Sequence, residues 1–117
     1  MSPAAYSLRV AADPSLSVTV RMFAAEAARS LGFAEGEVED LRLLATELLG
    51  NAVDTGGAWL ELTLSAEDGR WCLRARGAGA LDVAADHVVD RRDVLTGLAR
   101  LDVFADGTLE LRPADGP

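Results

Sequence analysis

The sequence has a single cysteine and fewer basic than acidic residues. Its 117 residues include one cysteine, Cys72, which cannot form an internal disulfide and indicates a reducing compartment. All 11 basic residues are arginines, because the sequence contains no lysine. Against 19 acidic residues they leave a net charge of −8, which argues against binding a nucleic-acid backbone or another polyanion. The first twenty residues lack a continuous apolar block, so we expect no signal peptide, no membrane span and a cytoplasmic location.

What is present is an ordinary globular composition. Half of the residues are apolar and 26% are charged, which excludes a disordered or collagen-like chain. The length suits a single domain over residues 1–117 with a core of its own.

The spacing of apolar residues predicts the elements of the first two thirds of the chain. Alternation predicts a strand over residues 6–10. Asp13-Pro14-Ser15 then supplies capping chemistry for a helix that ends near Gly32. The strongest helical pattern covers residues 37–54, with acidic residues in its first turn. Two alternating runs, 58–65 and 71–76, predict a hairpin whose loop is 66–69.

The last third combines an irregular stretch with a second hairpin. Residues 77–92 show no convincing period and are expected to form a loop, a candidate lid. A helix is predicted over 93–101, followed by short strands at 103–104 and 108–112. This order of elements predicts an α+β fold, a two-layer sandwich in which a mixed, mostly antiparallel sheet carries its helices on one face.

Three polar side chains form a line along the second helix. Glu47, Asn51 and Asp54 stand at i, i+4 and i+7, between apolar neighbours. A carboxylate beside an amide is costly to bury without partners, so the line indicates a ligand, a metal or a solvent-filled cleft. A solvated helix face is the alternative that these three residues leave open.

The sequence around this line resembles a known family. The segment Ala45-Thr46-Glu47-Leu48-Leu49-Gly50-Asn51-Ala52-Val53 is similar to the N box of the GHKL superfamily, in which an acid and an amide stand four residues apart. Residues 8–14, Arg21, 31–33 and 40–44 look like the small bacterial anti-sigma factor and serine kinase branch of that superfamily. The similarity extends over nearly the whole chain and weakens after residue 75.

The resemblance implies a Bergerat-type ATP-binding fold with ATP and Mg²⁺ as cofactors. Asn51 matches the amide that holds Mg²⁺ between the ATP phosphates, and Glu47 matches the catalytic acid that acts as base or orients the attacking group. Mg²⁺ takes few protein ligands and completes its shell with water and phosphate oxygens, so one amide oxygen can be enough. Asp54 stands among the cofactor-binding positions where relatives often have histidine.

The two remaining motifs of the family are altered in this chain. In the adenine motif Gly77 and Gly79 remain, but Ala75 occupies the place of the aspartate that accepts the adenine hydrogen bond. Losing such a bond costs on the order of 1.5 to 3 kcal/mol, or roughly ten- to a hundredfold in affinity. In the phosphate motif Thr96 and Gly97 remain, and Leu95 stands in for the first glycine.

Three functions remain open at this point. The first is an anti-sigma-type regulator that binds ATP weakly, captures a sigma factor and phosphorylates an antagonist protein as a serine kinase. The second is a scaffold of the same family that has lost nucleotide and acts as a protein-binding module, which the changes at Ala75, Leu95 and Asp54 favour. The third, a detached ATPase domain of a sensor histidine kinase, lacks the upstream phosphoacceptor helices. For the regulator, the resemblance also implies a homodimer.

Overall fold

The computed structural model describes residues 4–79 and 95–114. Its elements are β1 (Ala5–Ala11), a 3-10 turn (Pro14–Leu16), α1 (Ser17–Ser30), α2 (Glu35–Asp54), β2 (Trp59–Glu67), β3 (Arg70–Arg76), β4 (Ala99–Val103) and β5 (Leu109–Pro113). Residues 95–98 form a helical turn directly before β4. Most of the candidate lid, residues 80–92, lies outside the described residues.

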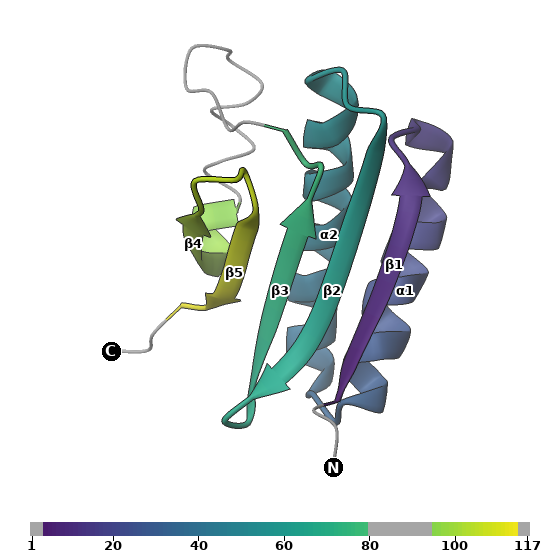
Figure 1. The fold of residues 1–117 in the computed structure, drawn as a ribbon. Coiled ribbons are helices and arrows are strands. Elements are labelled where there is room, and N and C mark those ends of the chain that lie inside the picture. The colour runs from purple at the N-terminus through teal and green to yellow at the C-terminus, as the bar shows by residue number, and fades with distance from the viewer. Residues whose placement is uncertain (1–3, 80–94, 115–117) are drawn as a thin grey trace.

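The five strands form one sheet in the order β1-β2-β3-β5-β4. All four pairings between neighbouring strands are antiparallel. Figure 1 shows α1 and α2 side by side behind β1, β2 and β3. Among the described residues the other face of the sheet carries no helix, and we call it the helix-free face. The predicted α+β sandwich is therefore confirmed, and every pairing in the described sheet is antiparallel.

Alternation along the strands separates an apolar face from a polar one. Leu62 pairs with Ala75, and Leu64 with Leu73, so these side chains share one face of the hairpin, as the sequence predicted. They are fully buried against the helices. The helices contribute apolar side chains at three- and four-residue spacing, which include Val20, Ala24, Ala28, Val38, Leu41, Leu44, Leu48 and Ala52.

Local chemistry explains where several elements begin and turn. The Asp13 carboxylate accepts a hydrogen bond of 2.9 Å from the Ser15 amide, which starts the 3-10 turn rather than α1 itself. The β2–β3 hairpin closes through Asp68 and Gly69, both with positive φ, as a two-residue turn of the primed type requires. The predicted loop of four residues is therefore shorter in the structure.

The prediction of a helix over 93–101 is wrong at the C-terminal end of that range. Helical structure is described only for 95–98, and Ala99 already begins β4. Five residue pairs join β4 to β5, among them Leu101 with Leu111. Pairing with β5 in the sheet outweighs the local helical spacing of these leucines. The second hairpin is present, with strands 99–103 and 109–113 in place of 103–104 and 108–112.

No helix within the described ranges combines the length and the apolar character needed to cross a membrane.

Candidate functional site

The amide of Asn51 lies at a junction between α2 and the end of β3. Asn51 is fully buried although it is polar. Its Nδ2 donates a hydrogen bond of 2.7 Å to the Ala78 carbonyl and a longer one of 3.4 Å to the Gly79 carbonyl. The structure therefore brings together Asn51 of the N box and the glycine-containing segment that the sequence placed in the adenine motif.

The two carboxylates of the polar line have different surroundings. Glu47, one helical turn before Asn51, is half-buried, and Asp54, the last residue of α2, is exposed. The line therefore runs from a partly covered position through a buried one into solvent. The solvated face that the sequence left open applies to Asp54 and does not apply to Asn51.

Gly77 and Gly79 are both required by close packing in this structure. Gly77 has φ +79°, and a Cβ there would lie 2.8 Å from the Trp59 ring. Gly79 has φ +84°, and a Cβ there would lie 2.8 Å from the Thr55 Cβ. Left-handed backbone and the lack of space both exclude a side chain at these positions. The glycines thus let the chain leaving β3 pass against the end of α2 and the start of β2.

Thr55 and Trp59 were not singled out by the sequence motifs, although they frame this junction. The Thr55 hydroxyl donates a hydrogen bond of 2.8 Å to the Asn51 carbonyl and so closes the end of α2. The Trp59 ring carries the Arg9 guanidinium 4.0 Å from its centroid, a cation–π contact at the start of β2. The sequence signals that could have indicated them are the Thr-Gly-Gly helix stop and the aromatic residue that follows it.

Ala75 is part of the core. It is fully buried and pairs with Leu62 on one side and Leu109 on the other. Its methyl group offers no acceptor to an adenine amino group.

The phosphate motif is divided between core and surface. Leu95 is fully buried and belongs to the hydrophobic core, whereas Thr96 and Gly97 are exposed on the helical turn before β4. The leucine that replaces the first glycine therefore anchors this turn to the core.

Clustered metal-binding side chains are absent from the part of the chain that the structure describes. No group of three histidine, cysteine, aspartate or glutamate side chains there could hold a metal ion. The residues also fit Mg²⁺-ATP poorly. Ala75 supplies no acceptor, the buried Leu95 takes the place of a phosphate-motif glycine, and the space beside Gly77 and Gly79 is taken by Trp59 and Thr55.

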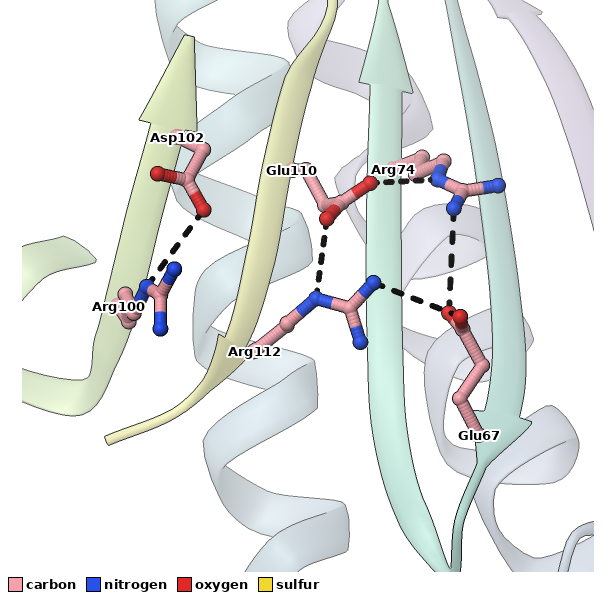
Figure 2. Close-up of polar contacts among 6 residues, drawn as sticks. All are labelled: Glu67, Arg74, Arg100, Asp102, Glu110 and Arg112. Atoms are coloured by element: carbon pink, nitrogen blue, oxygen red, sulfur yellow. Dashed lines mark hydrogen bonds and ion pairs between the residues drawn. The ribbon is translucent and has the colours of Figure 1, made fainter. Parts of the chain in front are cut away.

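A second polar group, which the sequence motifs did not indicate, lies on the helix-free face of the sheet. Figure 2 shows charged side chains from four strands in front of the sheet, with the helices behind it. They are Glu67, Arg74, Arg100, Asp102, Glu110 and Arg112. Charged residues alternating with apolar ones in 73–76 and 109–112 were the available signal.

A groove also lies at the sheet edge where β1 faces α1. Its volume is about 340 Å³, and its lining includes Tyr6, Leu8, Met22 and Phe23. The Met22 side chain is 61% exposed, and β1 is an edge strand because it pairs with β2 alone. This combination of an open strand edge and exposed apolar side chains is the second surface of interest.

Comparisons with known proteins identify the fold. The chain is similar to the crystal structure of the RsbU and RsbW domains of Rv1364c from Mycobacterium tuberculosis, with a TM-score of 0.61 and 19% sequence identity. This chain shares the fold of the matched part of the mycobacterial chain. The similarity covers 92% of this chain and 31% of the mycobacterial chain, so it spans about a third of that protein's length. No family model matches the sequence, and no curated protein matches it.

Proposed function

We propose that this chain is a regulatory protein-binding domain of the anti-sigma type that acts through protein contact without bound nucleotide. The observation that carries the proposal is Ala75, which is fully buried at the place of the adenine-binding aspartate and offers no hydrogen-bond acceptor. The fold shared with the RsbU and RsbW domains supports the regulatory part of the proposal. The proposed partners are a sigma factor and an antagonist protein, in the cytoplasm, with residues 1–117 acting as one domain.

The surroundings of Asn51 support the loss of nucleotide. In a site for Mg²⁺-ATP this side chain would direct its oxygen to the metal, with water and phosphate around it. Here the residue is fully buried and packs under the chain leaving β3. The missing acceptor at Ala75 and the core position of Leu95 remove two further contacts that a nucleotide would need.

The second candidate is an ATP-dependent protein serine kinase, with Glu47 as catalytic base and Asn51, Asp54, Gly77, Gly79, Thr96 and Gly97 around the nucleotide. The observation that favours it is the i, i+4 spacing of Glu47 and Asn51 on one face of α2. A carboxylate one helical turn from the amide can accept a proton from a serine hydroxyl.

Thermal melting with and without Mg²⁺-ATP separates the two candidates. Millimolar Mg²⁺-ATP should leave the melting temperature of the purified protein unchanged. A ligand at a hundred times its dissociation constant would stabilise the fold by about 2.7 kcal/mol, which is a shift of roughly 10 °C for a domain of this size. Mg²⁺ alone and ATP alone are the controls. A shift that requires both components would contradict the nucleotide-free proposal and leave the kinase candidate standing.

The groove between β1 and α1 supports a homodimer as the functional oligomeric state. Pairing of two β1 edges in antiparallel register would satisfy their outward-facing backbone groups. A two-fold axis would place the same surface on both subunits, as a closed dimer requires. Tyr6 and Met22 of each copy would then be withdrawn from water.

A further inference from the structure

The strands of the sheet are joined by ladders of different length. Seven residue pairs connect β1 to β2 and seven connect β2 to β3, but only three connect β3 to β5. The C-terminal hairpin, which we define as β4 and β5 with their connecting turn, is held together by five pairs. Its attachment to β3 is therefore the shortest ladder in the described sheet.

Four charged side chains cross this short ladder and form a closed ring. Arg74 Nε donates to Glu110 Oε2 at 2.8 Å, and Arg112 Nε donates to Glu110 Oε1 at 2.9 Å. Arg112 Nη2 lies 3.4 Å from Glu67 Oε1, and Arg74 Nη2 lies 3.9 Å from Glu67 Oε2. We call Glu67, Arg74, Glu110 and Arg112 the charge ring; Figure 2 shows its four contacts. It joins β2, β3 and β5.

The centre of the charge ring is Glu110. Its side chain is only 9% exposed and accepts from two guanidinium groups at once. Burial alone would raise the pKa of Glu110, but the hydrogen bonds from Arg74 and Arg112 hold it below its ordinary value. Removing one partner of such a group is more costly than removing an exposed ion pair, because the remaining charge stays buried.

The charged side chains of the other strand, β4, take no part in the charge ring. Across the β4–β5 ladder Arg100 faces Arg112, and Asp102 faces Glu110, so like charges stand opposite each other. Arg100 and Asp102 lie 3.6 Å apart within β4 itself. The ion pairs that β5 makes with β2 and β3 belong to the charge ring. Outside the ring, Arg70 of β3 donates a hydrogen bond of 3.2 Å to the Pro113 carbonyl at the end of β5.

Cys72 lies on the same face as the charge ring and is completely covered. Its register partner on β2 is Ser65, two residues from Glu67, which places it on the helix-free side. The thiol is nonetheless fully buried. Burial and a hydrogen bond to Glu67 raise the pKa of the Cys72 thiol to about 11, and Glu110 and Arg112 lie close enough to influence it. The labelling of Cys72 by a thiol reagent therefore tests whether this face of the sheet stays covered.

We propose that the charge ring is the fastening of the C-terminal hairpin, and that the hairpin separates from β3 as one unit, before the rest of the sheet opens, and thereby uncovers Cys72. The short β3–β5 ladder provides the place where opening occurs, and the ring sets how often it occurs. Structures commonly open in such cooperative units below the free energy of global unfolding.

The test uses thiol labelling and amide hydrogen exchange on the full chain. Cys72 is the sole cysteine of the sequence, so a disulfide reagent such as dithionitrobenzoate at fixed pH reports on it alone. The substitution Glu110→Gln keeps the size of the side chain and removes the charge. It should raise the labelling rate at least tenfold and raise amide exchange across residues 99–113, while exchange across 59–67 stays unchanged.

The matched control is Asp102→Asn, which removes a carboxylate from the same face but not from the charge ring. This variant should label at the wild-type rate. Faster labelling of Glu110→Gln without faster exchange in β5 would overturn the proposal, because the ring would then only shield the thiol. Equal exchange rates in β2 and β5 of the wild-type protein would also overturn it, because the hairpin would then open only with the whole sheet.

Discussion

At the scale of single residues, two glycines that look like a nucleotide motif have a structural reason to be there. Gly77 and Gly79 carry positive φ and lie against Trp59 and Thr55. A glycine that belongs to a nucleotide motif and a glycine that packing requires look the same in a sequence. Only the residues that surround the glycine in the structure distinguish the two cases. The same holds for Asn51, whose amide supports the backbone after β3.

The packing role of Gly79 can be separated from its backbone conformation. Gly79→Ala should destabilise the fold by about 2 to 4 kcal/mol, since it adds a close contact with Thr55 to the cost of a left-handed alanine. Gly107→Ala is the matched control, because Gly107 has φ +90° and open space around it. That variant should lose only about 1 kcal/mol. Urea unfolding measures both, and equal losses would contradict a packing role for Gly79.

At the scale of elements, most of the architecture could be predicted because its signals are local. Leu60, Leu62 and Leu64 alternate, and the α2 leucines recur at helical spacing, so each element shows its own buried face. The end of the 93–101 helix could not be predicted, because Leu101 is drawn into β4 by its pairing with Leu111. The charge ring was also beyond local reasoning, since Glu67 and Glu110 come to share Arg74 and Arg112 only through the strand order.

The candidate site depends more on tertiary structure. The face of α2 that the spacing of Glu47 and Asn51 singled out carries one buried polar residue, Asn51. What the sequence could not reveal is the contact that Asn51 makes, because its acceptors at Ala78 and Gly79 lie 27 and 28 residues away. The role of Thr55 as a neighbour of Gly79 is likewise a product of tertiary packing.

The groove formed by α1 and β1 yields a prediction about assembly. Met22→Glu places a charge in the surface that we propose for the dimer, so it should convert a dimer into a monomer in analytical ultracentrifugation. Leu43→Glu is the matched control, because Leu43 is an exposed apolar residue of α2 that does not line the groove. A wild-type protein that sediments as a monomer at high concentration would refute the dimer, and dissociation by both variants would argue against this surface.

At the scale of the whole molecule, stability should fall on both sides of neutral pH for different reasons. The pKa values of Glu67 and Glu110 are both lowered in the folded protein. For Glu67 the main cause is a hydrogen bond from the Cys72 thiol. For Glu110 burial would raise the pKa, but the hydrogen bonds from Arg74 and Arg112 outweigh it. Their stabilisation is present above the unfolded pKa near 4.5 and is lost as the pH falls through the folded value. Urea midpoints should therefore decline below about pH 5.

The loss of stability at alkaline pH depends on Cys72. Its pKa rises from 9.0 to about 11 on folding. The contribution of the protonated thiol to the free energy of unfolding is therefore fully present below pH 9 and is lost as the pH rises toward 11. No lysine titrates in that range, because the chain has none. Cys72→Ala should flatten the decline of the urea midpoint between pH 8 and 10, relative to its own value at pH 7. An unaltered slope in this variant would show that the thiol does not control alkaline stability.

The two tryptophans occupy contrasting places in this fold. Trp71 is 2% exposed within the core, whereas the partly covered Trp59 ring lies under the Arg9 guanidinium at the start of β2. Iodide should quench the fluorescence of Trp59 and leave that of Trp71 bright, so emission spectra can report surface and interior separately. The molecule thus carries two intrinsic optical probes that need no label.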